Sequence, residues 1–457
     1  MRFIRSFVVL ALLFPIAAST RLDGEQGSSF QGSVDGLPAS PLAKDIDTQA
    51  AAIEPELRAW RRHLHEHPEL SNRELETAKY IAERLRSFGL EPQTGIARTG
   101  VVAVLKGAKP GPVVALRADM DGLPVREDSD LPFASKAIGE YEGQKVGVMH
   151  ACGHDAHMAI GLAAAKVLTS LKDRLPGTVK FIFQPAEEGA PSAERPAGAE
   201  LMVKEGVLDR PRVDAVFGLH VFANVETGHL LTRPGPMLAS SDIFEIIVRG
   251  RQTHGAAPWA GVDPIVVGSQ IVTALQTIVS RQVDITRLPA IVTVGQFQAG
   301  VRSNIIPDSA RLVGTIRAFD DRIQADIHER VKRTAESIAA SAGATAEVRV
   351  DRQYPVTANH PALTARMRPT LARVAGAAVG ETPLITGAED FTFYQRQVPG
   401  VFVILGVTPK EQVGKAAQNH SPRFFVDERA LVTGVRTLAH LAADYLFAGG
   451  SSGQTKP

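Results

Sequence analysis

The chain has 457 residues, of which 44% are hydrophobic and 22% are charged. This composition is ordinary for a globular enzyme, and the length allows two or three domains or one large α/β domain with an insertion. The 50 Lys and Arg residues nearly balance the 49 Asp and Glu residues. A net charge near zero gives no reason to expect nucleic acid or an acidic membrane surface as a partner.

The N-terminal segment predicts export. Arg2 and Arg5 precede an apolar run over residues 7–18, and small residues follow. This pattern is typical of a secretory signal peptide, and the run is shorter than the ~20 apolar residues that a spanning helix needs. We therefore expect a signal peptide at residues 1–19, a periplasmic or secreted protein, and no membrane attachment after cleavage; an uncleaved membrane anchor is the alternative. Residues 20–50, rich in Gly, Ser and Pro, are predicted to form a flexible leader.

Strand and helix patterns alternate through most of the remaining chain. Residues 55–88 contain two helical stretches, and apolar runs rich in branched residues then alternate with Ala-rich helical segments. This alternation predicts an α/β domain with a mainly parallel sheet.

Residues 238–352 depart from this pattern, because their predicted elements follow the order β-α-β-β-α-β of a ferredoxin-like unit. We therefore predict a catalytic domain in two halves, at residues 51–237 and 353–447, with the smaller domain inserted between them. Residues 448–457 are predicted to be a disordered tail.

Carboxylates and an imidazole follow three of the predicted strands. Asp119 and Asp121 follow the first, Glu187 and Glu188 the second, and His220 the third. In open α/β sheets, ligands bind beyond the carboxyl ends of the strands. These side chains are therefore expected to meet at one edge of the sheet.

A short segment adds a thiol and further imidazoles. It holds Cys152, the single cysteine, with His154 and His157, and His420 lies in a loop of the second half. With one cysteine the chain has no internal disulfide, and a free thiol is usually a small buried hydrophobe. A thiolate, imidazoles and carboxylates together suit zinc or another borderline divalent metal.

Each motif has a plainer interpretation when it is taken alone. A Glu-Glu pair usually marks a solvated surface, and His154 and His157 could form one packed helix face. Histidines 63, 65 and 67 are expected to be surface residues or to lie behind the site, and His440 is expected to be structural. The motifs of serine hydrolases, zincins, dehydrogenases and P-loop NTPases are absent from the sequence, which argues against those classes.

Taken together, these motifs resemble the M20 family of metallopeptidases. The similarity is to its amidohydrolase branch, which includes hippurate hydrolases and auxin–amino acid conjugate hydrolases. It covers nearly all of residues 55–447. The matching stretches are residues 61–74, 115–127, 150–162, 183–189, 217–221, 254–265, 304–319, 387–394 and 419–422.

The resemblance implies a role for each matched residue. The implied metal ligands are Cys152, His154, Glu188, His220 and His420. Glu187 is implied to be the general base and general acid, and Asp121 matches the second acid of the family's His-x-Asp block. Asp119 stands where many relatives have a ligating histidine.

The inserted domain is implied to serve as a lid and in dimerisation, so a homodimer is expected. His254 then completes an active site, in many relatives that of the opposite subunit, and Asn304 lies near it. Residues 190–200 form a longer stretch than in many relatives, which leaves the size of the substrate open.

The predicted function is hydrolysis of the amide bond of small N-acyl amino acids. Five ligands are too many for one catalytic zinc ion with an open position, so two divalent ions, zinc or manganese, are expected in each subunit. Glu187 would take a proton from a metal-bound water and deliver it to the leaving nitrogen. A metallo-carboxypeptidase or dipeptidase on the same scaffold is the first alternative, and a periplasmic solute-binding protein is an alternative from another class.

Overall fold

The structure is a computed structural model that describes residues 36–449. The predicted signal peptide at residues 1–19, the first part of the predicted leader and residues 450–457 of the predicted tail lie outside this range and stay predictions. None of the helices within the described range is long and apolar enough to cross a membrane.

The largest sheet has eight strands in the order β1-β2-β6-β3-β7-β18-β8-β17. Its centre consists of four mutually parallel strands, β6 (Pro176–Gln184), β3 (Lys109–Asp119), β7 (Ala215–Glu226) and β18 (Gly400–Thr408). Antiparallel pairs occur towards the edges, which hold β1 (Gln93–Ile96), β2 (Gly100–Lys106), β8 (Leu230–Thr232) and β17 (Val379–Glu381). The predicted α/β class with a mainly parallel sheet is confirmed.

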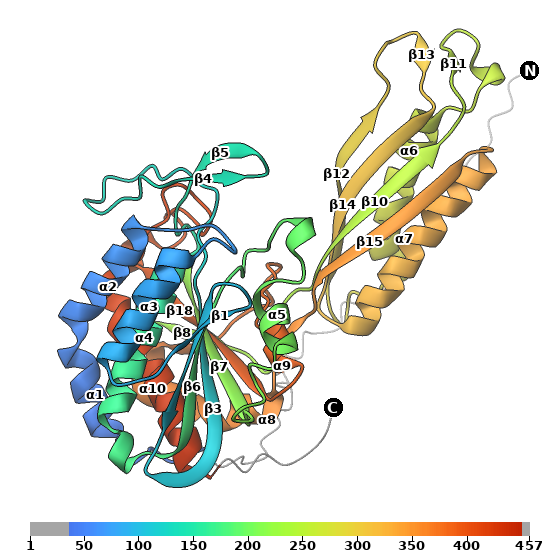
Figure 1. The fold of residues 1–457 in the computed structure, drawn as a ribbon. Coiled ribbons are helices and arrows are strands. Elements are labelled where there is room, and N and C mark those ends of the chain that lie inside the picture. Colours follow the sequence, from blue (N-terminus) through green and yellow to red (C-terminus); the bar gives the residue numbers. More distant parts are fainter. Residues whose placement is uncertain (1–35, 450–457) are drawn as a thin grey trace, which may run out of the picture. The chain divides into compact units, whose positions relative to one another are not determined.

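Helices cover both faces of this sheet (Figure 1). One layer consists of α1 (Ala43–Ala52), α2 (Glu54–Glu66), α3 (Leu75–Ser87), α4 (His154–Ser170), α8 (Pro361–Ala375) and α10 (Leu431–Phe447). The other face packs against the short helices α5 (Gly198–Lys204) and α9 (Thr392–Gln395). The remaining short strands of this region are β4 (Ile138–Tyr141), β5 (Gln144–Gly147), β9 (Gly235–Leu238) and β16 (Thr357–Asn359).

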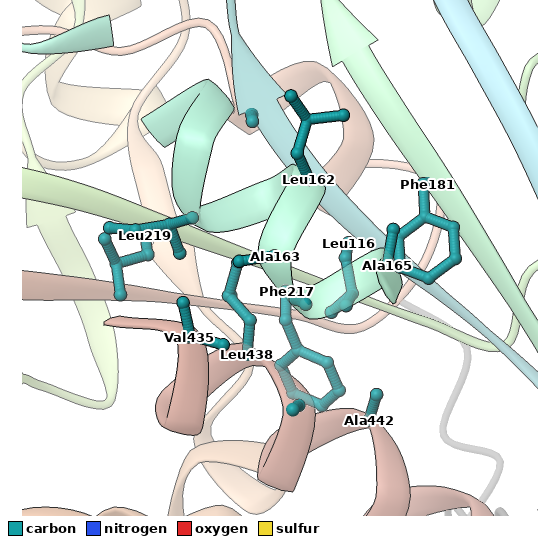
Figure 2. Packing of buried hydrophobic residues seen from close by; sticks show 14 of the residues in the cluster. Leu116, Leu162, Ala163, Ala165, Phe181, Phe217, Leu219, Val435, Leu438 and Ala442 are labelled. Atoms are coloured by element: carbon teal, nitrogen blue, oxygen red, sulfur yellow. The ribbon is translucent and has the colours of Figure 1, made fainter. Parts of the chain in front are cut away.

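Helix α4 is the centre of the larger core. Figure 2 shows its residues Leu162 and Ala163 among side chains of the sheet and of α10, which include Leu116, Phe181, Phe217, Leu438 and Ala442. A helix that is buried on all sides needs apolar or small residues all round, which explains its Ala-rich sequence. Each buried Leu or Phe side chain contributes about 1.5–3 kcal/mol. This packing therefore fixes α4, and with it His154 at the first position of the helix.

One part of the predicted leader is ordered, contrary to expectation. Residues Ala43–Ala52 form helix α1, and the side chains of Leu42, Ile46 and Ala50 are buried against the rest of the core. The prediction of a flexible leader is therefore wrong for residues 43–50. The Gly, Ser and Pro content of the preceding residues hid an apolar repeat at every fourth position, which is the spacing of one helix face.

The inserted domain contains four antiparallel strands and two long helices. In chain order these are β10 (Ser241–Arg249), α6 (Pro264–Thr277), β12 (Ala290–Ala299), β14 (Ser309–Ala318), α7 (Asp321–Ser341) and β15 (Thr345–Tyr354). The strand order is β12-β14-β10-β15, which confirms the predicted ferredoxin-like arrangement. Helices α6 and α7 cover one face of this sheet (Figure 1).

Both connections to the catalytic domain leave the inserted sheet at the same end. Ser241 at the start of β10 pairs with Tyr354 at the end of β15. The short strands β11 (Thr253–His254) and β13 (Ile305–Ile306) pair with each other beyond the opposite end of β10. Because β10 is 9 residues long and a strand rises about 3.3 Å per residue, the length of that strand separates His254 from the connections.

Candidate functional site

The parallel centre of the sheet brings the predicted site residues to one edge. Asp119, the last residue of β3, pairs in register with Gln184, the last residue of β6. Glu187 and Glu188 follow the end of β6 after two intervening residues, and His220 lies within β7, the strand on the other side of β3. The segments meet at one edge of the sheet as expected, although His220 lies inside its strand rather than after it.

Cys152 and His154 enter the site at the start of α4. The residue between them, Gly153, has φ +91°, and a side chain there would place its Cβ 2.3 Å from Val221 Cγ2. Only glycine tolerates both the left-handed backbone and this close approach. The turn thereby directs the thiol and the first imidazole of the helix towards the same edge of the sheet.

All five predicted metal ligands lie in one cluster. Cys152 Sγ is 3.3 Å from His220 Nε2 and 3.3 Å from His420 Nε2. Glu188 Oε1 lies 3.1 Å from His420 Nε2 and 3.9 Å from His154 Nε2. Two groups of three potential ligands result, and both include Cys152: one with His154 and His220, the other with Glu188 and His420.

One unpaired atom of this cluster fits a metal centre. His154 Nε2 is buried and has no hydrogen-bond partner among the described residues. A buried polar atom without a partner costs roughly 1–3 kcal/mol, and a cation bound by this nitrogen would remove that cost. Sulfur, imidazole nitrogen and carboxylate oxygen are also the donor set expected for zinc and related ions.

Two residues of the cluster, Cys152 and His220, have shifted pKa values that bear on metal binding. Burial raises the pKa of the Cys152 thiol well above its ordinary value, and the carboxylates of Glu188 and Glu187 raise it further. Burial also lowers the pKa of His220 well below its ordinary value. The imidazole is thus in the neutral form that binds metals, while a thiolate at Cys152 needs a cation beside it.

Asp119 and His157 form hydrogen bonds next to the cluster. Asp119 Oδ1 is 2.6 Å from His157 Nδ1, and the Val221 backbone N–H donates to His157 Nε2 at 2.8 Å. These three residues hold the backbone beside His220. Asp119, His154 and His157 form a further group with metal-ligand spacing, but both ring nitrogens of His157 already have partners.

Asp121 organises the turn that carries the two glutamates. Its carboxylate oxygens accept hydrogen bonds from the backbone N–H groups of Glu187 and Glu188, both at 3.0 Å, and from the Ser71 hydroxyl at 2.7 Å. The backbone oxygen of Asp121 lies 2.8 Å from His154 Nδ1. Asp121 therefore positions a ligand and the predicted base together; the catalytic role expected from the resemblance stays a prediction.

The predicted base, Glu187, is buried among other carboxylates. Burial raises its pKa well above the ordinary value, and the charges of Glu389 and Glu188 add to the effect. Its Oε2 lies 3.8 Å from His154 Nε2. A carboxylate with a raised pKa next to a candidate metal centre is suited to accept a proton and to release it again.

A fully buried arginine offsets the negative charge of two acids near Glu187. Arg117 of β3 contacts Glu389 at 2.9 Å and Asp390 at 2.8 Å. The matching stretch 387–394 included both acids, but sequence reasoning gave them no role. The available signal was an arginine inside the apolar strand segment 113–119, since a buried charge requires a partner.

His65 lies next to the site, in contact with Asp155, the residue that follows His154. Its side chain is buried, with Nδ1 2.9 Å from Asp155 Oδ2 and Nε2 3.1 Å from Glu127 Oε1. Arg61 donates to the same Asp155 oxygen at 2.7 Å. This network joins α2 to the start of α4. His440 instead contacts Asp47 of α1 at 2.9 Å, as expected for a structural residue.

His254 is not brought to the cluster by its own chain. It is exposed, its Nδ1 accepts a hydrogen bond from the Ala256 N–H at 2.9 Å, and it belongs to none of the candidate metal groups in residues 36–449. Asn304 lies beside it, since the Gly255 N–H donates to the Asn304 carbonyl at 2.8 Å. The two residues that the resemblance links are thus adjacent, at the end of the inserted sheet away from its connections.

Comparison with known proteins agrees with this site. Residues 115–444 match the sequence profile of Peptidase family M20/M25/M40. Thermostable carboxypeptidase 1 of Saccharolobus solfataricus is 40% identical over 406 residues, which cover 88% of this chain and 99% of that protein. The N-acyl-L-amino acid amidohydrolase of Geobacillus stearothermophilus is 42% identical over 317 residues, or 69% of this chain and 81% of that protein.

Among solved structures, the Bacillus subtilis YXEP protein, a dinuclear metal binding peptidase from the M20 family, has a TM-score of 0.73 and 36% identity. The similarity covers 87% of this chain and 99% of that one. The profile match spans most of the chain, and the candidate ligand groups are those of a metal-binding hydrolase. The chain belongs to Peptidase family M20/M25/M40, and it is a metal-binding hydrolase that acts on amide bonds.

Proposed function

We propose that this protein is an exported amidohydrolase that uses two divalent ions, zinc or manganese, to cleave small N-acyl amino acids. The observation that carries the proposal is Glu187, a buried carboxylate with a raised pKa that lies 3.8 Å from His154 and forms a candidate group with His154 and Glu188. Pure solute binding requires no such base. Export rests on the basic start and short apolar run of residues 1–19.

The residues of the chain divide the chemistry between them. When bound, the metal ions supply Lewis acidity to the amide carbonyl and to the attacking water. Glu187 takes the proton from that water and delivers it to the leaving nitrogen, a role worth about 10²–10⁴ in rate. Asp121 holds the backbone of Glu187 and Glu188 during this transfer.

A small cavity beside the cluster supports a small substrate. Its volume is about 230 Å³, and it opens next to Glu188. Much of the lining is apolar or aromatic, including Leu70, Leu123, Tyr141 and Pro191. It is smaller than the roughly 300–1,000 Å³ typical of sites for drug-sized ligands, as expected for a short acyl or side-chain group.

A carboxypeptidase acting on peptides is the second candidate. The 40% identity to thermostable carboxypeptidase 1 over 88% of this chain favours it. We expect N-acetyl and N-benzoyl amino acids to be cleaved with higher kcat/KM than unblocked dipeptides, measured by release of the free amino acid. Faster cleavage of the dipeptides would favour the carboxypeptidase, and no cleavage of either class would refute the proposed function.

We propose that the active protein is a homodimer in which each subunit supplies His254 to the other. The exposed position of His254 supports this. Strand β12 forms an edge of the inserted sheet, and Trp259 and Val301 near the same end of the domain are 82% and 100% exposed. Open strand edges and clustered apolar side chains are typical of surfaces between subunits.

The first mutational prediction concerns the metal content. Cys152→Ser replaces a thiolate with a hydroxyl that stays protonated, so at least one of two ions per chain is expected to be lost. Mass spectrometry of the metals after dialysis measures this. As a control, His63→Ala removes an exposed imidazole outside the ligand groups and is expected to keep both ions. Fully active wild-type protein with about one ion per chain would refute the two-metal proposal.

The second prediction concerns the base. Glu187→Gln is nearly isosteric but cannot accept the proton, so turnover is expected to fall by about 10²–10⁴ while metal content and melting temperature stay unchanged. The exposed Glu83→Gln substitution on α3 serves as the matched control and is expected to keep the wild-type rate. A Glu187→Gln enzyme that keeps more than about a tenth of the wild-type turnover is incompatible with this role.

The third prediction concerns His254. His254→Ala is expected to lower turnover by about 10²–10³, the effect of removing an oxyanion donor, with metal content unchanged. If the histidine acts across the dimer, mixing His254→Ala with Glu187→Gln chains restores up to about a quarter of the wild-type activity. Mixing Glu187→Gln with the double variant is the control and restores none. Failure of the first mixture despite proven subunit exchange would confine His254 to its own chain.

A further inference from the structure

Tyr354 lies where the inserted domain rejoins the catalytic domain. It is the last residue of β15 and pairs with Ser241, the first residue of β10, so both connecting segments start beside it. A residue at this place moves with the inserted sheet when that sheet turns about its connections.

The Tyr354 hydroxyl contacts the turn of the predicted base. It donates a hydrogen bond to the backbone carbonyl of Glu187 at 2.7 Å. Its ring packs edge-on against Phe393, with 6.4 Å between the ring centroids. Burial raises the pKa of Tyr354 well above its ordinary value, and the charges of Asp390 and Glu187 add to this, so the hydroxyl keeps its proton.

The turn itself depends on outside contacts. Ala186 has φ +52°, and a side-chain residue in this left-handed region costs about 1–2 kcal/mol. The Ala186 N–H donates to Glu74 Oε1 at 2.9 Å, and Asp121 accepts from the next two N–H groups. Side chains of the catalytic domain thus accept hydrogen bonds from the backbone N–H groups of the turn. Tyr354, which belongs to the inserted domain, donates one to the backbone carbonyl of Glu187 in that turn.

Two ion pairs stabilise the same orientation of the inserted domain. Arg195 contacts Asp351 of β15 at 2.7 Å, and Arg396 contacts Asp321 at the start of α7 at 2.6 Å. Both pairs are largely exposed, and such pairs contribute little individually. They therefore permit rotation about the connections, and such a rotation would break the part-buried hydrogen bond of Tyr354.

We propose that Tyr354 is a positioning residue that couples the orientation of the inserted domain to the alignment of Glu187. The inference rests on the proposed role of Glu187. A hydrogen bond of 2.7 Å is lost when its atoms separate beyond about 3.5 Å, so a small rotation of β15 releases the carbonyl. Glu187 is then held in its working position only in the orientation in which Tyr354 reaches it.

Tyr354→Phe tests the proposal, because it removes the hydroxyl and keeps the ring. We expect kcat to fall about 10-fold and KM to change less than about 2-fold, since a misplaced catalytic group slows the reaction without weakening binding. Metal content is expected to stay unchanged. Tyr445→Phe is the matched control: it removes another buried hydroxyl, which has no hydrogen-bond partner in the described part of the chain, and is expected to behave as wild type.

A double variant separates positioning from general structural damage. If Tyr354 acts through Glu187, Tyr354→Phe has no further effect on the residual rate of Glu187→Gln. An equal loss in both backgrounds would overturn the proposal, as would an unchanged kcat of the single variant.

Hydrogen exchange of the metal-loaded protein gives a readout that needs no activity. We expect the backbone amides of residues 187–189 to exchange faster in Tyr354→Phe than in Tyr445→Phe. Equal exchange in the two variants would overturn the inference. A wild-type protein that cleaves none of the tested amides would refute the proposed function, whereas the exchange result would still decide whether Tyr354 holds the turn.

Discussion

The structure depends on keeping a dense set of ionisable groups out of water at one edge of the sheet. Burial alone makes the Cys152 thiol hard to ionise and raises the pKa of Glu187. Isolated charges in such surroundings are strongly unfavourable unless opposite charges or ligands compensate them. Arg117 neutralises part of the charge of Glu389 and Asp390, and the buried His154 Nε2, which has no hydrogen-bond partner among the described residues, is available to a cation.

This constraint explains why the scaffold around the cluster is rigid. Helix α4 is buried on all sides, and the left-handed Gly153 before it leaves no room for a side chain. Asp121 fixes the glutamate turn through two backbone N–H groups rather than through the side chains themselves. Backbone contacts of this kind leave the carboxylates of Glu187 and Glu188 free for ligation and proton transfer.

The features that sequence reasoning predicted are those with a regular or local signal. Alternating apolar runs predicted the parallel sheet, and the element order predicted the ferredoxin-like insertion. The predicted ligands Cys152 and His154 were recognisable because they lie in one short block, and strand ends indicated where the carboxylates would meet.

Contacts between residues far apart in the chain left no comparable signal in the sequence. His65 was indistinguishable from its neighbours His63 and His67, because only the fold brings Asp155 and Glu127 to its ring. Helix α1 was missed because the polar composition of the residues before it outweighed an apolar repeat of a few residues. Tyr354 matched no motif, and its relevance depends on where a carbonyl 167 residues away lies.

The two ends of the inserted sheet differ in how they can contact the candidate site. Tyr354 lies at the end where the chain connects to the catalytic domain, and His254 lies beyond the other end of β10. If the inserted domain rotates about the connections, the end with His254 (the far end) moves a long way. The end with Tyr354 (the near end) moves only a little. A hydrogen bond tolerates only a small displacement, so the near end is where the part-buried contact of 2.7 Å can respond to rotation while the turn stays folded. His254 lies at the far end, so the role proposed for it requires a large displacement or a second chain, whereas the role proposed for Tyr354 requires only a small change in the orientation of the same domain.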